Sequence, residues 1–210
     1  MSKFADIYGH EQIKEHLQNA IRLNKVSHAY IFNGPMGSGK KMTAGIFAET
    51  LQCERHGQEP CGTCHSCIQS ESGNQPDIIW VHHEKPGSIG VDDVREQVIG
   101  DMQIKPYSSR YKIYIIDEAE KLTQQAQNAL LKTIEEPPAY GIIILLTTNA
   151  DTFLQTILSR CVRLDFRPLR DTLVTQYLQE KYDLTDYECR FATAFAQGKI
   201  GRAVTIATSK

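Results

Sequence analysis

A stretch near the start of the chain, NGPMGSGKKMT, carries residue types that could bind phosphate. A phosphate-binding loop has the pattern Gly, four residues, Gly, Lys, and then Ser or Thr. Gly34, Gly39 and Lys40 match this pattern. Gly37 lies inside the loop, and Lys41 stands where the hydroxyl residue is expected. The motif predicts a site for ATP or ADP, and the alternative is a glycine-rich turn that holds no ligand.

An acidic pair follows an apolar run in the segment IYIIDEAE. Asp117 and Glu118 have the residue types of a site in which an Asp lies near Mg²⁺ and a Glu activates water. The alternative is a turn with solvated carboxylates. The hydroxyl of a phosphate loop normally binds Mg²⁺, which Lys41 cannot ligate. We therefore expect impaired Mg²⁺ binding, little or no ATP hydrolysis, and a vestigial role for Glu118 as a base.

Four of the six cysteines cluster in CERHGQEPCGTCHSC, with the spacing C-x7-C-x2-C-x2-C. They are Cys53, Cys61, Cys64 and Cys67. Four thiolates favour a tetrahedral, structural Zn²⁺ site with no open position for catalysis. Redox-active pairing and an iron–sulfur cluster are the alternatives. His56 and His65 are expected to be exposed and not to be ligands, because four sulfurs already complete such a site.

The composition is that of an ordinary globular protein, with 41% hydrophobic and 23% charged residues in 210. A net charge of −2 gives no overall basic field for nucleic acid. The N-terminus lacks an apolar signal core, and no run is long enough to span a membrane. We expect a cytoplasmic protein with no membrane partner.

Short apolar runs alternate with helical patterns over the first 167 residues. The runs predict strands over 28–33, 77–82, 111–117, 141–147 and 161–166. Helical spacing of apolar residues predicts helices over 10–23, 91–102 and 122–136, and a further helix after the glycine-rich loop. Strands separated by helices predict an α/β fold, a mostly parallel sheet with helices on both faces. From Pro168 onward we expect three helices and no strand.

An ordered set of motifs resembles the bacterial clamp-loader subunits of the AAA+ superfamily over nearly the whole chain. After the phosphate loop and the cysteines come SGNQPD, GVDDVREQV, IIDEAE, NALLKTIEEPP, LLTTN and ILSRC. The resemblance implies an AAA+ P-loop domain over 1–167, with a five-stranded, mostly parallel sheet. It also implies an inserted zinc module at about 53–67 and a helical lid domain over 168–210.

The resemblance also suggests roles for single residues. Arg160, in SRC, corresponds to an arginine finger that acts on ATP held by a neighbouring subunit, and the alternative is an ordinary surface arginine. Asn149, or Thr148 beside it, corresponds to the sensor 1 position near the γ-phosphate. Arg202 corresponds to sensor 2 in the lid, or is a charge on a helix surface.

Two kinds of clamp-loader subunit share these features, the ATP-hydrolysing gamma/tau type and the weakly or non-hydrolysing delta-prime type. Lys41 and the segments GNQPD and GVDDVREQV favour delta prime, with gamma/tau as the alternative. The implied partners are gamma/tau and delta subunits and, through the assembly, the sliding clamp and primed DNA of a DNA polymerase III holoenzyme. The sequence ends where a helical collar domain would begin, so we expect the 210-residue chain alone to be monomeric.

Overall fold

A computed structural model describes residues 2–83 and 85–209 and has a single five-stranded sheet. The strands are β1 (Ala29–Asn33), β2 (Ile78–Val81), β3 (Lys112–Ile116), β4 (Gly141–Thr147) and β5 (Val162–Asp165). Their order is β2-β3-β4-β1-β5, and every neighbouring pair is parallel. The structure thus confirms the five predicted strands, each to within a residue or two, and the parallel sheet.

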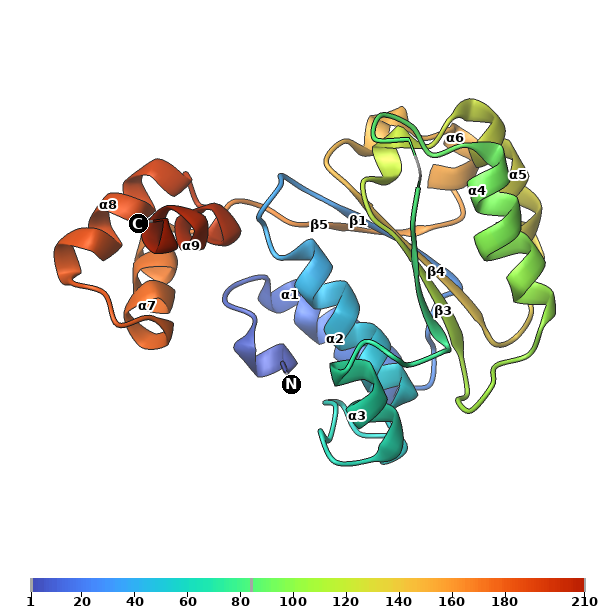
Figure 1. The fold of residues 1–210 in the computed structure, drawn as a ribbon, viewed down its shortest axis with the longest axis horizontal. Coiled ribbons are helices and arrows are strands. Elements are labelled where there is room, and N and C mark those ends of the chain that lie inside the picture. The colour runs from blue at the N-terminus through green and yellow to red at the C-terminus, as the bar shows by residue number, and fades with distance from the viewer. Residues whose placement is uncertain (1, 84, 210) are drawn as a thin grey trace.

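Helices cover both faces of the sheet (Figure 1), because alternate residues of each buried strand point to opposite sides. On one face, helices α1 (Glu11–Arg22) and α2 (Lys40–Gln52) pack through Leu17 and Phe47 against β1 and β4. On the other face, α5 (Gln124–Glu135) packs through Leu130. Thr123 caps α5 by accepting a hydrogen bond from the backbone N–H of Ala126.

The predicted helix over 91–102 is interrupted. It consists of α4 (Val91–Val94), a π-helical stretch (Arg95–Gly100) and a 3-10 turn (Asp101–Gln103). Its buried side chains, Val94, Val98 and Met102, recur every four residues. A regular α-helix has 3.6 residues per turn, so wider winding keeps all three on the core side. The prediction of one continuous α-helix is wrong for this reason.

The end of the described chain is helical and has a core of its own. Its helices are α7 (Asp171–Lys181), α8 (Asp186–Ala196) and α9 (Ile200–Thr208). They lie apart from the α/β body in Figure 1 and enclose a small cluster that includes Val174, Leu178 and Ala192. The division into domains at 1–167 and 168–210 stays a prediction, and its end residues, Met1 and Lys210, lie outside the described residues.

The remaining elements are short. They are α3 (His65–Glu71), α6 (Gln155–Leu158) and 3-10 turns at Phe4–Asp6, Ala119–Lys121 and Ala150–Thr152. Within the described part of the chain, none of the helices has both the length and the apolar character needed to cross a bilayer.

Candidate nucleotide and metal sites

The glycine-rich loop connects the carboxyl end of β1 to the start of α2. Gly37 and Gly39 have φ angles of +77° and +94°, in the left-handed region where glycine is favoured. Gly39 is the N-cap of α2. The first N–H groups of a helix have no intrahelical partner, and the helix dipole favours negative charge there. The local geometry is therefore that of a phosphate-binding loop.

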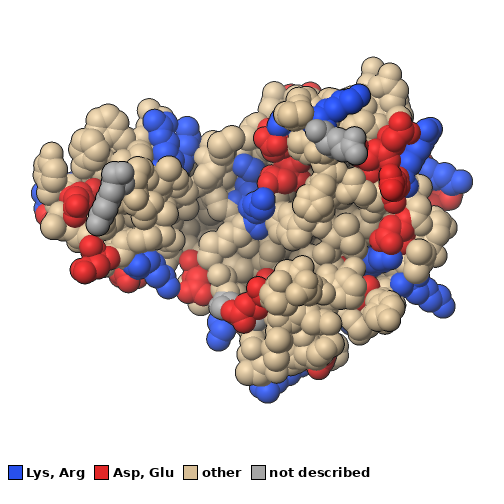
Figure 2. All heavy atoms as spheres, viewed as in Figure 1, with Lys and Arg blue, Asp and Glu red and all other residues tan. Residues whose placement is uncertain are grey.

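A pocket of about 450 Å³ lies over this loop, between the α/β body and the C-terminal helices. Its walls include Gly37, Gly39, Lys40, Lys41, Asp117, Glu118, Glu120, Thr148, Tyr177 and Gly201. In Figure 2 the surface is hollowed at the junction of these two parts, and basic and acidic side chains lie next to each other there. The fold thus brings the predicted loop and the predicted acidic pair into one pocket.

Lys40 is folded back onto the loop. Its ammonium donates to the carbonyl oxygen of Gly34 and, at 2.9 Å, to that of Pro35. The residue is 8% exposed, and burial lowers the pKa of its amine. These two carbonyls hold the charge of Lys40 inside the loop.

Lys41 points toward the acidic pair. Its Nζ atom lies 3.2 Å from Oδ2 of Asp117 and 5.2 Å from the centre of the Trp80 ring. Thr43, the nearest hydroxyl residue along the helix, is buried and donates to the carbonyl oxygen of Gly39 at 3.0 Å. The Mg²⁺ ion of related sites needs an oxygen ligand at position 41 and an available Asp. The residues present do not fit that ion.

Glu118, the predicted vestigial base, is also paired. Its carboxylate lies 2.7 Å from Nζ of Lys121 and 3.6 Å from Nε2 of His83. The residue has φ +50°, uncommon for a residue other than glycine. A carboxylate oxygen that is paired with a lysine is not free to orient an attacking water molecule.

Sequence reasoning missed Glu120 in the same wall of the pocket. Its carboxylate accepts hydrogen bonds from the hydroxyl of Thr148, at 2.7 Å, and from its backbone N–H, at 3.3 Å. Burial raises the pKa of Glu120, but these hydrogen bonds outweigh it and the net shift is downward. Glu120 stands three residues after Asp117 in the sequence. This closeness to a predicted site residue was the signal that could have identified it. Tyr177, from α7, was also missed because only the tertiary fold brings it to the loop.

The three residues predicted for the sensor positions do not all face the pocket. Thr148 lines it, whereas the side chain of Asn149 turns back to accept a hydrogen bond from the N–H of Asp151. Arg202 is exposed and is not part of the pocket wall, although its neighbour Gly201 is. The backbone N–H of Gly201 donates to the carbonyl oxygen of Gly37 at 2.8 Å. The C-terminal helices thus contact the loop through the backbone of α9.

Arg160 lies at the opposite end of the strands from the glycine-rich loop. It precedes β5, whose first residue, Val162, pairs with Tyr30 near the amino end of β1. The loop follows the carboxyl end of β1, so the length of the strands separates Arg160 from its own pocket. Its guanidinium contacts Oε1 of Glu135 at 3.0 Å and donates to the carbonyl oxygen of Thr156, also at 3.0 Å. The side chain is 40% exposed and held in place.

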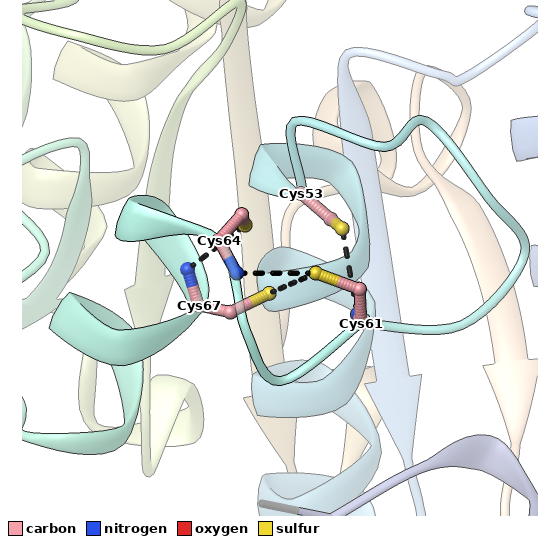
Figure 3. Close-up of side chains that lie close together, drawn as sticks. All are labelled: Cys53, Cys61, Cys64 and Cys67. Atoms are coloured by element: carbon pink, nitrogen blue, oxygen red, sulfur yellow. Dashed lines mark hydrogen bonds between the residues drawn. The ribbon is translucent and has the colours of Figure 1, made fainter.

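The four clustered cysteines converge between the end of α2 and the start of α3 (Figure 3). Their sulfur atoms all lie within 4.8 Å of one another, and the sulfurs of Cys61 and Cys67 are 3.9 Å apart. Tetrahedral Zn–S bonds of about 2.3 Å place sulfurs about 3.8 Å apart. His56 and His65 are exposed and outside this group. The donor set therefore fits zinc, and the cluster could bind it.

Backbone N–H groups point at these sulfurs. Cys61 Sγ accepts from the N–H groups of Thr63, at 3.5 Å, and Cys64, at 3.3 Å. The hydrogen bonds from Thr63 chiefly lower the pKa of Cys61, to about 5, whereas burial raises the pKa of Cys67. Thiolate is the metal-binding form, so the turn at Cys61 already favours a ligand.

Comparison with solved structures identifies the class of fold. RuvB from Thermotoga maritima, a Holliday junction branch migration motor, matches with a TM-score of 0.62 at 17% identity, over 95% of this chain and 61% of RuvB. A gamma subunit-related protein of DNA polymerase III from the same organism matches with a TM-score of 0.58 at 26% identity, over 89% of this chain and 58% of that one. The fold is thus of the AAA+ type.

The chain belongs to the family described as "DNA polymerase III, delta subunit", whose family profile matches residues 9–170. The tau/gamma subunit of DNA polymerase III from Haemophilus influenzae is 38% identical over 97% of this chain and 30% of its own length. The tau subunit from Bacillus subtilis is 40% identical over 86% of this chain and 32% of its own length. The chain thus spans about a third of the length of these two relatives.

Proposed function

We propose that this chain is a clamp-loader subunit of DNA polymerase III that hydrolyses ATP weakly or not at all and supplies Arg160 to ATP on a neighbouring subunit. The assembly would use that ATP to load a sliding clamp onto primed DNA in the cytoplasm. One observation carries the proposal. Arg160 is fixed by Glu135 and Thr156 at the opposite end of the strands from its own loop, and so lies away from any nucleotide that this loop would hold.

A guanidinium supplied in trans offsets charge that develops on the transferred phosphoryl group. The pairing of Lys41 with Asp117 and of Lys121 with Glu118 supports the other half of the proposal, because both groups needed for hydrolysis are occupied. The four cysteines would hold a structural Zn²⁺ ion on the same body.

A hydrolysing gamma/tau-type subunit is the second candidate. The matched relatives are named tau and gamma, and this favours the gamma/tau type over the delta-prime assignment made from the sequence. Lys41 favours the weakly hydrolysing subunit, because a hydrolysing subunit needs a metal ligand at that position. The rate of ATP hydrolysis by this chain distinguishes the two candidates.

The test is the ATPase rate of a clamp loader reconstituted with this protein and its partner subunits. Arg160→Ala is expected to lower turnover at the neighbouring site about a hundredfold or more, and Arg160→Lys to restore little, since lysine lacks the planar fork. Arg190→Ala, which removes an exposed arginine paired within α8, is the matched control. An unchanged rate with Arg160→Ala in an intact assembly would contradict the proposal.

A further inference from the structure

We infer that the ammonium group of Lys41 takes the place of a divalent cation in this loop, so that the chain binds the phosphates of ATP or ADP without Mg²⁺. The inference rests on the proposed use of the loop as a nucleotide site and specifies the form of the ligand. Its starting observation is that Nζ of Lys41 lies 3.2 Å from Oδ2 of Asp117, the carboxylate that would attract the metal.

Lys41 has the chemistry that this position requires. An ammonium is a compact positive charge with three N–H donors and no acceptor. One donor facing Asp117 leaves two for phosphate oxygens. Lys41 and Asp117 line the same pocket as Gly37 and Gly39, so these donors and the loop face one space. A divalent cation would have to displace the lysine to reach Asp117.

The charges of the acidic pair are already offset by lysines. Asp117 pairs with Lys41, and Glu118 pairs with Lys121 at 2.7 Å. Lys40 adds a further positive charge inside the loop. A polyphosphate entering the pocket therefore meets Asp117 and Glu118 already paired with lysines without a metal ion, while Glu120 is held by Thr148. In water-exposed pairs the attraction is modest, so the positions of the charges matter more than the strength of any one pair.

Trp80 also contacts Lys41. The ammonium lies over the indole ring at 5.2 Å from its centre, within the range of a cation–π contact. Trp80 is the only tryptophan in the sequence, so tryptophan emission comes from this residue alone. Movement of the ammonium from the ring toward a phosphate should change the emission.

The experiment titrates the full chain with ATP and with ADP, in Mg²⁺ and in EDTA, by Trp80 fluorescence and by equilibrium dialysis. For the unmodified protein we expect the two dissociation constants to agree within about twofold. Lys41→Thr should weaken binding in EDTA about tenfold, about 1.4 kcal/mol, and Mg²⁺ should restore it. Lys41→Met, which keeps the length without the charge, should lose affinity in both media. Lys25→Thr, at an exposed lysine outside the pocket, is the control.

Two results would overturn the inference: loss of binding by the unmodified protein in EDTA, or no binding in either medium. Circular dichroism of each variant, compared with Lys25→Thr, separates loss of the site from loss of the fold. The Arg160→Ala test measures hydrolysis of ATP held by another subunit, whereas the Lys41 test measures nucleotide binding by this chain. Either proposal can therefore fail while the other stands.

Discussion

The cysteine cluster and the phosphate loop are candidate ligand sites at the two ends of α2, and they differ in how complete their sets of ligand groups are. The cluster has four sulfur donors within 4.8 Å, and backbone N–H groups already favour thiolate at Cys61. The loop has its glycines and Lys40 but carries Lys41 in place of a metal ligand. A chain can thus keep the shape of a phosphate loop while a single residue, Lys41, removes a ligand that Mg²⁺ would need.

Loss of a cysteine ligand should have the largest effect. Cys67→Ser removes a buried donor, so we expect loss of bound zinc and a decrease of ~3 kcal/mol or more in the free energy of unfolding. Zinc content by atomic spectroscopy and a denaturant titration measure the two effects. Cys161→Ala, outside the cluster, should retain the metal. If the unmodified protein also contains no zinc, the cysteine cluster is not a metal site, and its contrast with the phosphate loop is wrong.

The metal-free cluster should show unequal thiol reactivity. Hydrogen bonds lower the pKa of Cys61 to about 5, while burial raises that of Cys67. At pH 7 Cys61 should therefore alkylate about tenfold faster than Cys67, because thiolate is the nucleophile. The Cys61 rate should stay nearly constant down to pH 6 and fall as the pH passes through about 5, where the thiolate gains a proton. Peptide mass spectrometry after a timed reaction with iodoacetamide gives both rates, and equal rates would show that the turn at Cys61 does not activate its sulfur.

Restoring the hydroxyl of the loop should have the smallest effect. Lys41→Thr frees Asp117 and supplies an oxygen for Mg²⁺, but Glu118 remains paired with Lys121. We expect Mg²⁺-dependent ATP turnover by the isolated chain to rise only about threefold. Steady-state phosphate release measures it. Substantial turnover by the unmodified chain, abolished by Lys40→Ala, would instead favour the gamma/tau type.

The sequence predicts much of this fold because its signals are local. The strands are continuous apolar runs, such as GIIILLT over 141–147, and the loop occupies the turn that its glycines require. The interruption at Arg95–Gly100 could not be predicted from residue types, since it depends on three side chains facing one core.

Site residues far apart in the sequence were harder to predict. Whether Thr148 or Asn149 faces the pocket is decided by the turn, in which Asn149 bonds to Asp151 and Thr148 bonds to Glu120. The pairing of Lys41 with Asp117 joins two motifs that the sequence shows separately, and only the fold brings them together.

The central claim is that this chain acts on a neighbour's ATP and not through its own loop. The most direct measurement compares Arg160→Ala with Lys40→Ala, each in this chain only, by the ATPase rate of the reconstituted clamp loader with primed DNA. We expect a large loss with Arg160→Ala and little change with Lys40→Ala, because Arg160 is held by Glu135 away from this loop and the proposed function gives the loop itself little hydrolysis. A large loss with Lys40→Ala and none with Arg160→Ala would contradict it.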